Sequence, residues 1–258
     1  MVTMNRNSRR IYALIEGLTL TLFAAALLAA ISLQRGSFGW SWDALNHHIY
    51  LGLIAETPRW SNDVAAAASQ TYQYPYLYWP TYRISLLNGS GAVVSAAWSA
   101  TQAALMMMPV WLLIYRMFPD AEMPWEARAY RVLAFGLALS SLPVIGVLGT
   151  TANDALAAVP VLWALAIGLG FPGRLSAAIG SAGLIGAAIA FKFSNVLFLP
   201  MLAIVCWQPS PPRLPLRSLL SMSLALFAGF GIFYAPWGWQ LWTETGNPFY
   251  PYFARVFS

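Results

Sequence analysis

The sequence predicts an all-α, polytopic membrane protein with about seven transmembrane helices. The 258-residue chain is 59% hydrophobic and only 9% charged. Its mean hydropathy of +0.60 lies outside the range of ordinary soluble domains. Apolar segments long enough to cross a bilayer, which takes about 20 residues, recur along the chain. No linker rich in Gly and Ser separates a second unit. We therefore expect a single membrane domain over residues 1–258.

Seven apolar segments are the candidate spans. They are 11–33, 92–115, 129–149, 153–171, 175–190, 193–207 and 216–237. The first is too long for a cleavable signal peptide and lacks its small-residue cleavage site. Glu16 within it is expected to pair with a neighbouring polar group. The fifth and sixth segments are short and flank Lys192, which leaves two interpretations open: two abutting short helices, or one kinked hairpin.

The distribution of basic residues predicts the orientation. Nine Lys and Arg residues fall on the side of the N-terminus, either before the first span or between spans two and three, four and five, or six and seven. The opposite side, which includes the 34–91 insert, has five. The positive-inside rule then places the N-terminus in the cytoplasm and the 34–91 insert outside. With seven spans, the tail 240–258 also lies outside. Because the basic residues cap helices at the cytoplasmic face beside membrane lipids, the net charge of +5 requires no nucleic-acid partner.

The insert 34–91 is polar and aromatic, in contrast to the spans beside it. It contains both histidines and three of the nine acidic residues. Residues 42–55 have apolar side chains at helical spacing, which predicts a short interfacial helix. Residues 64–70 predict a second short helix, with Asn62 or Asp63 as its N-cap. The Tyr- and Pro-rich run that follows, 72–82, is expected to be extended along the membrane interface.

Two residues of the first insert helix are the leading catalytic candidates. Asp43 and His47 are four positions apart, so they share one helix face. A carboxylate there could orient an imidazole, hold a divalent cation or accept a proton from a nucleophile. The alternative is an ordinary solvated face. His48 points to a different side of the helix and is kept as a candidate substrate-binding residue; no zinc motif is present.

Further candidates lie at the same predicted membrane face. Asp154 either caps the fourth span or joins the site as a third catalytic residue, and these roles are compatible. Lys192, the only lysine, either extends to the outer interface or binds a phosphate. Arg59 and Arg83 are alternative phosphate contacts. Tyr74 belongs to an aromatic run that either stacks on sugar rings or forms an interface belt.

Four sequence elements together resemble the bacterial GT-C-type glycosyltransferases. They are WDALNHHIY (42–50) with QTYQYPYLY (70–78), TANDALAA (151–158), AFKFSN (190–195) and PWGWQLWTETGNPFYPYF (236–253). The resemblance covers nearly the whole chain, as the N-terminal seven-span module of such enzymes. It implies a multi-pass protein of the bacterial inner membrane that takes a sugar from a polyprenyl-phosphate donor. Asp43 matches the catalytic acid of the first outer loop, and Asp154 and Lys192 match the later acid and the phosphate contact.

Two functions are therefore expected for this chain. The first is inverting sugar transfer, in which Asp43 deprotonates the acceptor or helps to hold a divalent cation. The second is a non-catalytic subunit, built on a truncated transferase scaffold, that braces a larger complex of membrane proteins. The span 175–190 consists largely of Ala, Gly and Ser. This spacing of small residues allows close approach by another helix, either of this chain or of a partner.

Overall fold

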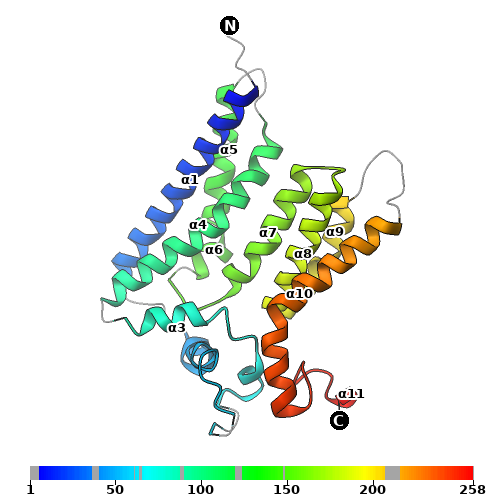
Figure 1. Cartoon of the computed structure of the whole chain (residues 1–258). Coiled ribbons are helices and arrows are strands. Elements are labelled where there is room, and N and C mark those ends of the chain that lie inside the picture. The colour runs from blue at the N-terminus through cyan, green and yellow to red at the C-terminus, as the bar shows by residue number, and fades with distance from the viewer. Residues whose placement is uncertain are drawn as a thin grey trace.

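The computed structural model describes residues 6–36, 41–60, 62–63, 66–87, 90–119, 124–147, 149–206 and 216–257. These residues form an all-α structure, which confirms the predicted class (Figure 1). The α-helices are α1 (Arg6–Arg35), α2 (Ile49–Ile54), α3 (Trp79–Ser85), α4 (Gly91–Met117), α5 (Pro124–Leu139), α6 (Leu142–Val147), α7 (Asp154–Gly170), α8 (Leu175–Phe191), α9 (Leu199–Cys206), α10 (Leu216–Thr245) and α11 (Ala254–Phe257). A π-helical turn η1 (Ala44–His48) and the 3₁₀ turns η2 (Ala68–Tyr72) and η3 (Phe193–Phe198) complete the set.

Among the described residues, three helices are long and apolar enough to cross a membrane. They are Ile11–Arg35 within α1, then α4 and α10. Three shorter apolar helical segments accompany them: α7, α8 and Phe193–Ile204. The chain therefore has the character of a multi-pass membrane protein, and the count of seven spans stays a prediction.

Two of the predicted spans differ from the structure. The segment 129–149 is not one helix, because α5 ends at Leu139 and α6 starts at Leu142 after a turn. The last span continues beyond residue 237 to Thr245. Around Lys192 the predicted division into two segments holds: Lys192 is extended (φ −154°, ψ 113°) and separates α8 from η3 and α9, and the two helices contact each other.

A buried ion pair joins α1 to α5. α1, α4 and α5 pack around Met107, Trp111 and Phe135. Arg131 donates from Nε and Nη2 to the Glu16 carboxylate at 2.7 and 2.8 Å, and from Nη1 to the Phe118 carbonyl at 2.9 Å. The guanidinium is almost fully buried. The expectation that Glu16 pairs with a neighbouring group is confirmed.

The face of small residues on α8 packs against α10. A Cβ at Gly186 would overlap the carbonyl oxygen of Leu226, and one at Gly229 would overlap that of Gly183. These glycines thus let the two backbones touch. Within the described residues, the helix that uses this face belongs to the same chain.

The insert confirms one of its three local predictions. Residues 42–54 are helical, as expected, through η1 and α2. The second predicted helix is misplaced: its start, 64–65, lies outside the described residues, and a 3₁₀ turn covers Ala68–Tyr72 instead. The extended run was also wrong at its end, because α3 begins at Trp79 with Pro80 in its first turn, where proline is tolerated.

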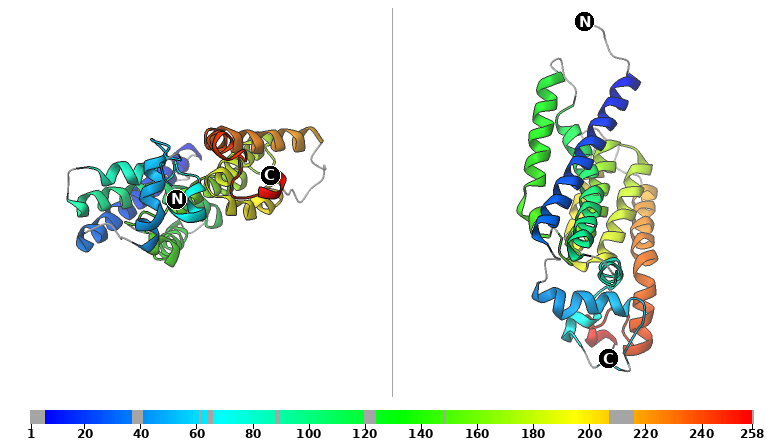
Figure 2. Two further views of the ribbon diagram at one scale, coloured as in Figure 1. Left: turned by 90° about the horizontal axis from the view of Figure 1, so that it is seen from below. Right: turned by 90° about the vertical axis from the view of Figure 1, so that its left-hand side faces the viewer.

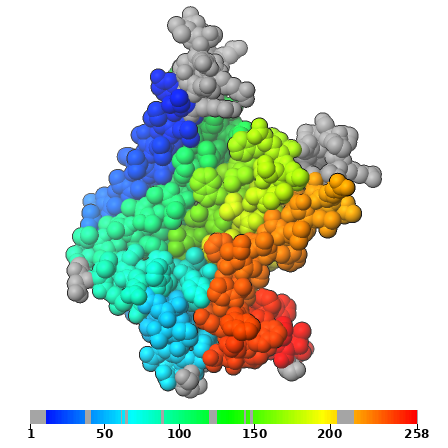
Figure 3. Space-filling view, viewed as in Figure 1, coloured from blue at the N-terminus to red at the C-terminus, as the bar shows by residue number. Residues whose placement is uncertain are grey.

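The insert and the C-terminal tail lie at one end of the helix bundle, and the start of α1 lies at the other (Figures 1 and 2). In space-filling view, the insert and the end of α10 form adjacent surfaces at that end (Figure 3). The rings of Tyr72 and Tyr250 meet edge to face at 4.6 Å, which joins the insert to the tail. This arrangement is the one that the predicted topology requires.

Cysteine labelling tests the topology in a Cys206→Ser background. Single cysteines at the exposed positions Asn62 in the insert and Arg255 in the tail should both react with an impermeant maleimide on intact cells. A cysteine at the exposed Arg128, at the opposite end of the bundle, should react only after permeabilisation. Labelling of Arg128→Cys on intact cells would reverse the predicted orientation.

Candidate functional site

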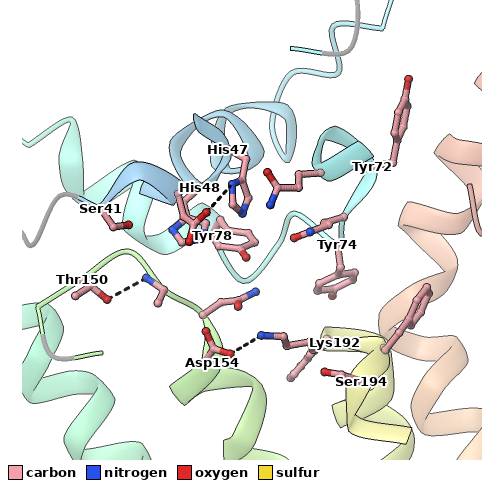
Figure 4. A pocket seen from close by; sticks show the side chains of 18 of the residues that line it. Ser41, His47, His48, Tyr72, Tyr74, Tyr78, Thr150, Asp154, Lys192 and Ser194 are labelled. Atoms are coloured by element: carbon pink, nitrogen blue, oxygen red, sulfur yellow. Dashed lines mark hydrogen bonds and ion pairs between the residues drawn. The ribbon is translucent and has the colours of Figure 1, made fainter. Parts of the chain in front are cut away.

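A cavity of about 530 Å³ lies at the end of the bundle where the insert is found. The insert, the loop before α7, the α8–η3 junction and α10 form its walls (Figure 4). Six of the eight predicted site residues line it: Asp43, His47, His48, Tyr74, Asp154 and Lys192. Segments far apart in sequence thus bring the main candidates together.

An ion pair between Lys192 and Asp154 crosses one wall of the cavity. α8 ends just before Lys192, whose extended backbone directs the ammonium group to the carboxylate in the first turn of α7 (Figure 4). Asn153 occupies the N-cap position of α7, as one of the two predicted alternatives. Its side chain makes no capping hydrogen bond to the helix. Both partners are about half exposed, so the pair contributes little stability and can open for a ligand.

Asp43 and His47 face each other on the insert helix, as their spacing predicts. His47 Nδ1 lies 3.9 Å from Asp43 Oδ1, which is beyond hydrogen-bond distance. The imidazole is buried, and its Nδ1 has no hydrogen-bond partner among the described residues. Burial lowers the pKa of His47, and the carboxylate of Asp43 opposes this shift. A buried ring nitrogen without a partner beside a half-exposed carboxylate suits proton transfer with a bound hydroxyl.

His48 has a different environment from His47. Its Nδ1 lies 2.7 Å from Thr151 Oγ1, and its ring stacks on Tyr78 with centroids 4.7 Å apart. Burial, with a smaller contribution from His47, lowers the pKa of His48 to about 4. Its ring is therefore neutral near pH 7. Thr151 could not be predicted as its partner, because 103 positions separate the two residues.

Tyrosines form much of the remaining wall. Tyr74 and Tyr78 come from the aromatic run of the insert, and Tyr234 comes from α10. Tyr74 donates to the Phe233 carbonyl at 3.3 Å, and Tyr234 donates to the Pro248 carbonyl at 3.0 Å. Burial raises the pKa values of Tyr74 and Tyr78, so both hydroxyls stay protonated. Tyr234 was not among the predicted site residues. It lies in an apolar span, where no neighbouring polar residues mark it as part of a site.

The two predicted loop arginines do not line the cavity. Arg59 donates to Asp63 at 2.8 Å, four positions along the insert. Arg83 pairs with Glu56, which also accepts a bond from Trp79. Both guanidinium groups are thus engaged by carboxylates away from the cavity.

The described residues contain no group of three or more His, Cys, Asp or Glu side chains placed to hold a metal ion. The carboxylates of Asp43 and Asp154 are the oxygen ligands that a hard divalent cation would use in this cavity.

Comparison with protein-family models, with curated proteins and with solved structures finds no match to this chain.

Proposed function

We propose that this chain is a GT-C-like membrane glycosyltransferase that uses a polyprenyl-phosphate sugar donor. The observation that carries the proposal is the convergence of Asp43, His47 and the Asp154–Lys192 pair in one cavity at the end of apolar helices. Ionisable groups are costly beside a bilayer, and a group of them in a cavity is typical of a site. The resemblance of the sequence motifs supplies the reaction class.

The proposed reaction is a single inverting displacement. The hydroxyl oxygen of the acceptor attacks the anomeric carbon of the donor, and its proton passes to the carboxylate of Asp43. The bond between the anomeric carbon and the phosphate oxygen breaks, and the ammonium group of Lys192 stabilises the charge on the departing lipid phosphate. In this scheme Asp154 holds Lys192 until the donor phosphate replaces it, which the exposure of the pair permits.

The variant Asp43→Asn tests this proposal. Membranes containing the wild-type chain should transfer label from a polyprenyl-phosphate sugar. Asp43→Asn should reduce the rate at least about 100-fold, because general-base catalysis contributes roughly 10²–10⁴. Asp63→Asn is the matched control, since this acid also lies in the insert but pairs with Arg59 outside the cavity. Equal loss in both variants would remove Asp43 from the mechanism.

The alternative, a non-catalytic subunit, loses one of its supporting features. The small-residue face of α8 that suits a partner helix is in contact with α10 of the same chain. Gentle detergent extraction still separates the two functions. A stoichiometric co-purifying partner together with no sugar transfer would favour the subunit.

A further inference from the structure

The adjacent residues His47 and His48 point in different directions and do different things. Both belong to the π-helical turn η1, and their ring planes lie at 71° to each other. His47 lines the cavity and leaves its Nδ1 without a hydrogen-bond partner among the described residues. His48 also lines the cavity, but its Nδ1 is 2.7 Å from Thr151 Oγ1 in the loop that leads into α7.

The His48–Thr151 hydrogen bond is buried on both sides. The two residues are 7% and 2% exposed, and the bond length is 2.7 Å. Stacking on Tyr78 and an edge contact from His47, at 4.4 Å between ring centroids, fix the imidazole plane. A hydrogen bond in such a low-dielectric site is strong, and a partner left alone there would be costly. The ring is neutral near pH 7, so the bond does not depend on protonation in that range.

The bond links the two halves of the proposed catalytic apparatus. His48 follows Asp43 by five residues along one short helix, and Thr151 precedes Asp154 by three. On its α10 side the insert is held by bonds from Tyr74 to Phe233 and from Trp237 to Tyr72. On its α7 side it is held by the His48–Thr151 bond.

We propose that the His48–Thr151 hydrogen bond is a clamp that fixes the Asp43–His47 face of the insert against the Asp154–Lys192 pair. His48 is then a positioning residue in the wall of the cavity. The catalytic part of this inference rests on the proposed sugar transfer; the geometric part does not. A displacement of about 1 Å between reacting groups can lower a rate by about 100-fold, so such a clamp has a large kinetic effect.

Kinetics test the catalytic part. His48→Leu and Thr151→Val should each lower kcat about 10- to 100-fold with less than a threefold change in KM, because the groups that bind substrate remain. The double variant should be no slower than either single variant, since both remove the same bond. His48→Asn should recover most of the rate, because its amide can occupy the place of the ring Nδ1. Additive losses, or no rescue by His48→Asn, would overturn the clamp.

Ser32→Ala is the matched control. Ser32 and Ser99 form another buried side-chain hydrogen bond of 2.7 Å between distant segments, and neither residue lines the cavity. This variant should lower the thermal stability about as much as Thr151→Val while leaving kcat unchanged. An equal loss of kcat in Ser32→Ala would mean that any buried bond matters and that the clamp has no special role.

A distance measurement tests the geometric part without any activity. In Cys206→Ser, spin labels at the exposed positions Leu45 on the insert and Leu197 on η3 should give one narrow distance distribution by pulsed EPR. His48→Leu and Thr151→Val should broaden it, whereas Ser32→Ala should not. An unchanged distribution in both clamp variants would overturn the clamp. If the wild type transfers no sugar but the distributions broaden as expected, the clamp stands and the proposed function fails.

Discussion

Replacing Arg131 with methionine is expected to destabilise the helix bundle by about 3–5 kcal/mol, the cost of leaving one member of a buried ion pair alone. Arg131 is 1% exposed; it donates two hydrogen bonds to the Glu16 carboxylate and one to the Phe118 carbonyl, and its guanidinium lies over the Tyr115 ring. Its loss leaves the Glu16 carboxylate in an apolar setting formed by α1, α4 and α5. Thermal unfolding in detergent, followed by tryptophan fluorescence, should show a decrease in Tm of about 10 °C.

The partner variants separate charge from packing. Glu16→Leu combined with Arg131→Met should recover most of the lost stability, because apolar side chains of similar volume commonly replace a buried pair without cost. Arg255→Met is the matched control at an exposed position of the tail, and it should leave the Tm unchanged. A double variant as unstable as Arg131→Met would show that shape, rather than the unpaired carboxylate, causes the loss.

The sequence predicted the parts of the molecule that depend on local patterns. The helix over 42–54 follows from its apolar spacing, and the face shared by Asp43 and His47 follows from their separation of four. The gathering of Asp154 and Lys192 followed from the predicted topology, which placed both at one membrane face. The structure adds that they form an ion pair.

The remaining features depend on tertiary contacts that no local pattern records. The turn between α5 and α6 interrupts an apolar run that looks continuous in sequence. α3 accommodates Pro80 in its first turn, whereas a proline among tyrosines by itself indicated an extended chain. Thr151 reaches His48, and Tyr234 reaches the cavity, from distant elements. Each sits in a stretch whose composition is typical of ordinary helix ends or spans.

Gly186→Leu is expected to separate α8 from α10 and to cost about 3 kcal/mol or more, since overpacking of a close contact cannot be relieved by rotamer changes alone. A Cβ at Gly186 would overlap the carbonyl of Leu226 and approach the Phe230 nitrogen to 2.8 Å. The obstructing atoms are backbone, so α10 itself must move. Tyr234 follows on the same helix one turn after Phe230, so the cavity wall should move with it.

Gly231→Leu provides the control on the neighbouring helix, because a Cβ there meets no atom within 4 Å. Leucine is a better helix former than glycine by nearly 1 kcal/mol, so this variant should be neutral or slightly stabilising. Gly229→Leu should behave like Gly186→Leu, since its Cβ would overlap the Gly183 backbone from the opposite side of the same contact. Thermal unfolding of the three variants therefore maps the contact directly. Equal Tm values for Gly186→Leu and Gly231→Leu would show that α8 and α10 do not touch at these glycines. The small-residue face of α8 would then be free to pack against a helix of a partner protein.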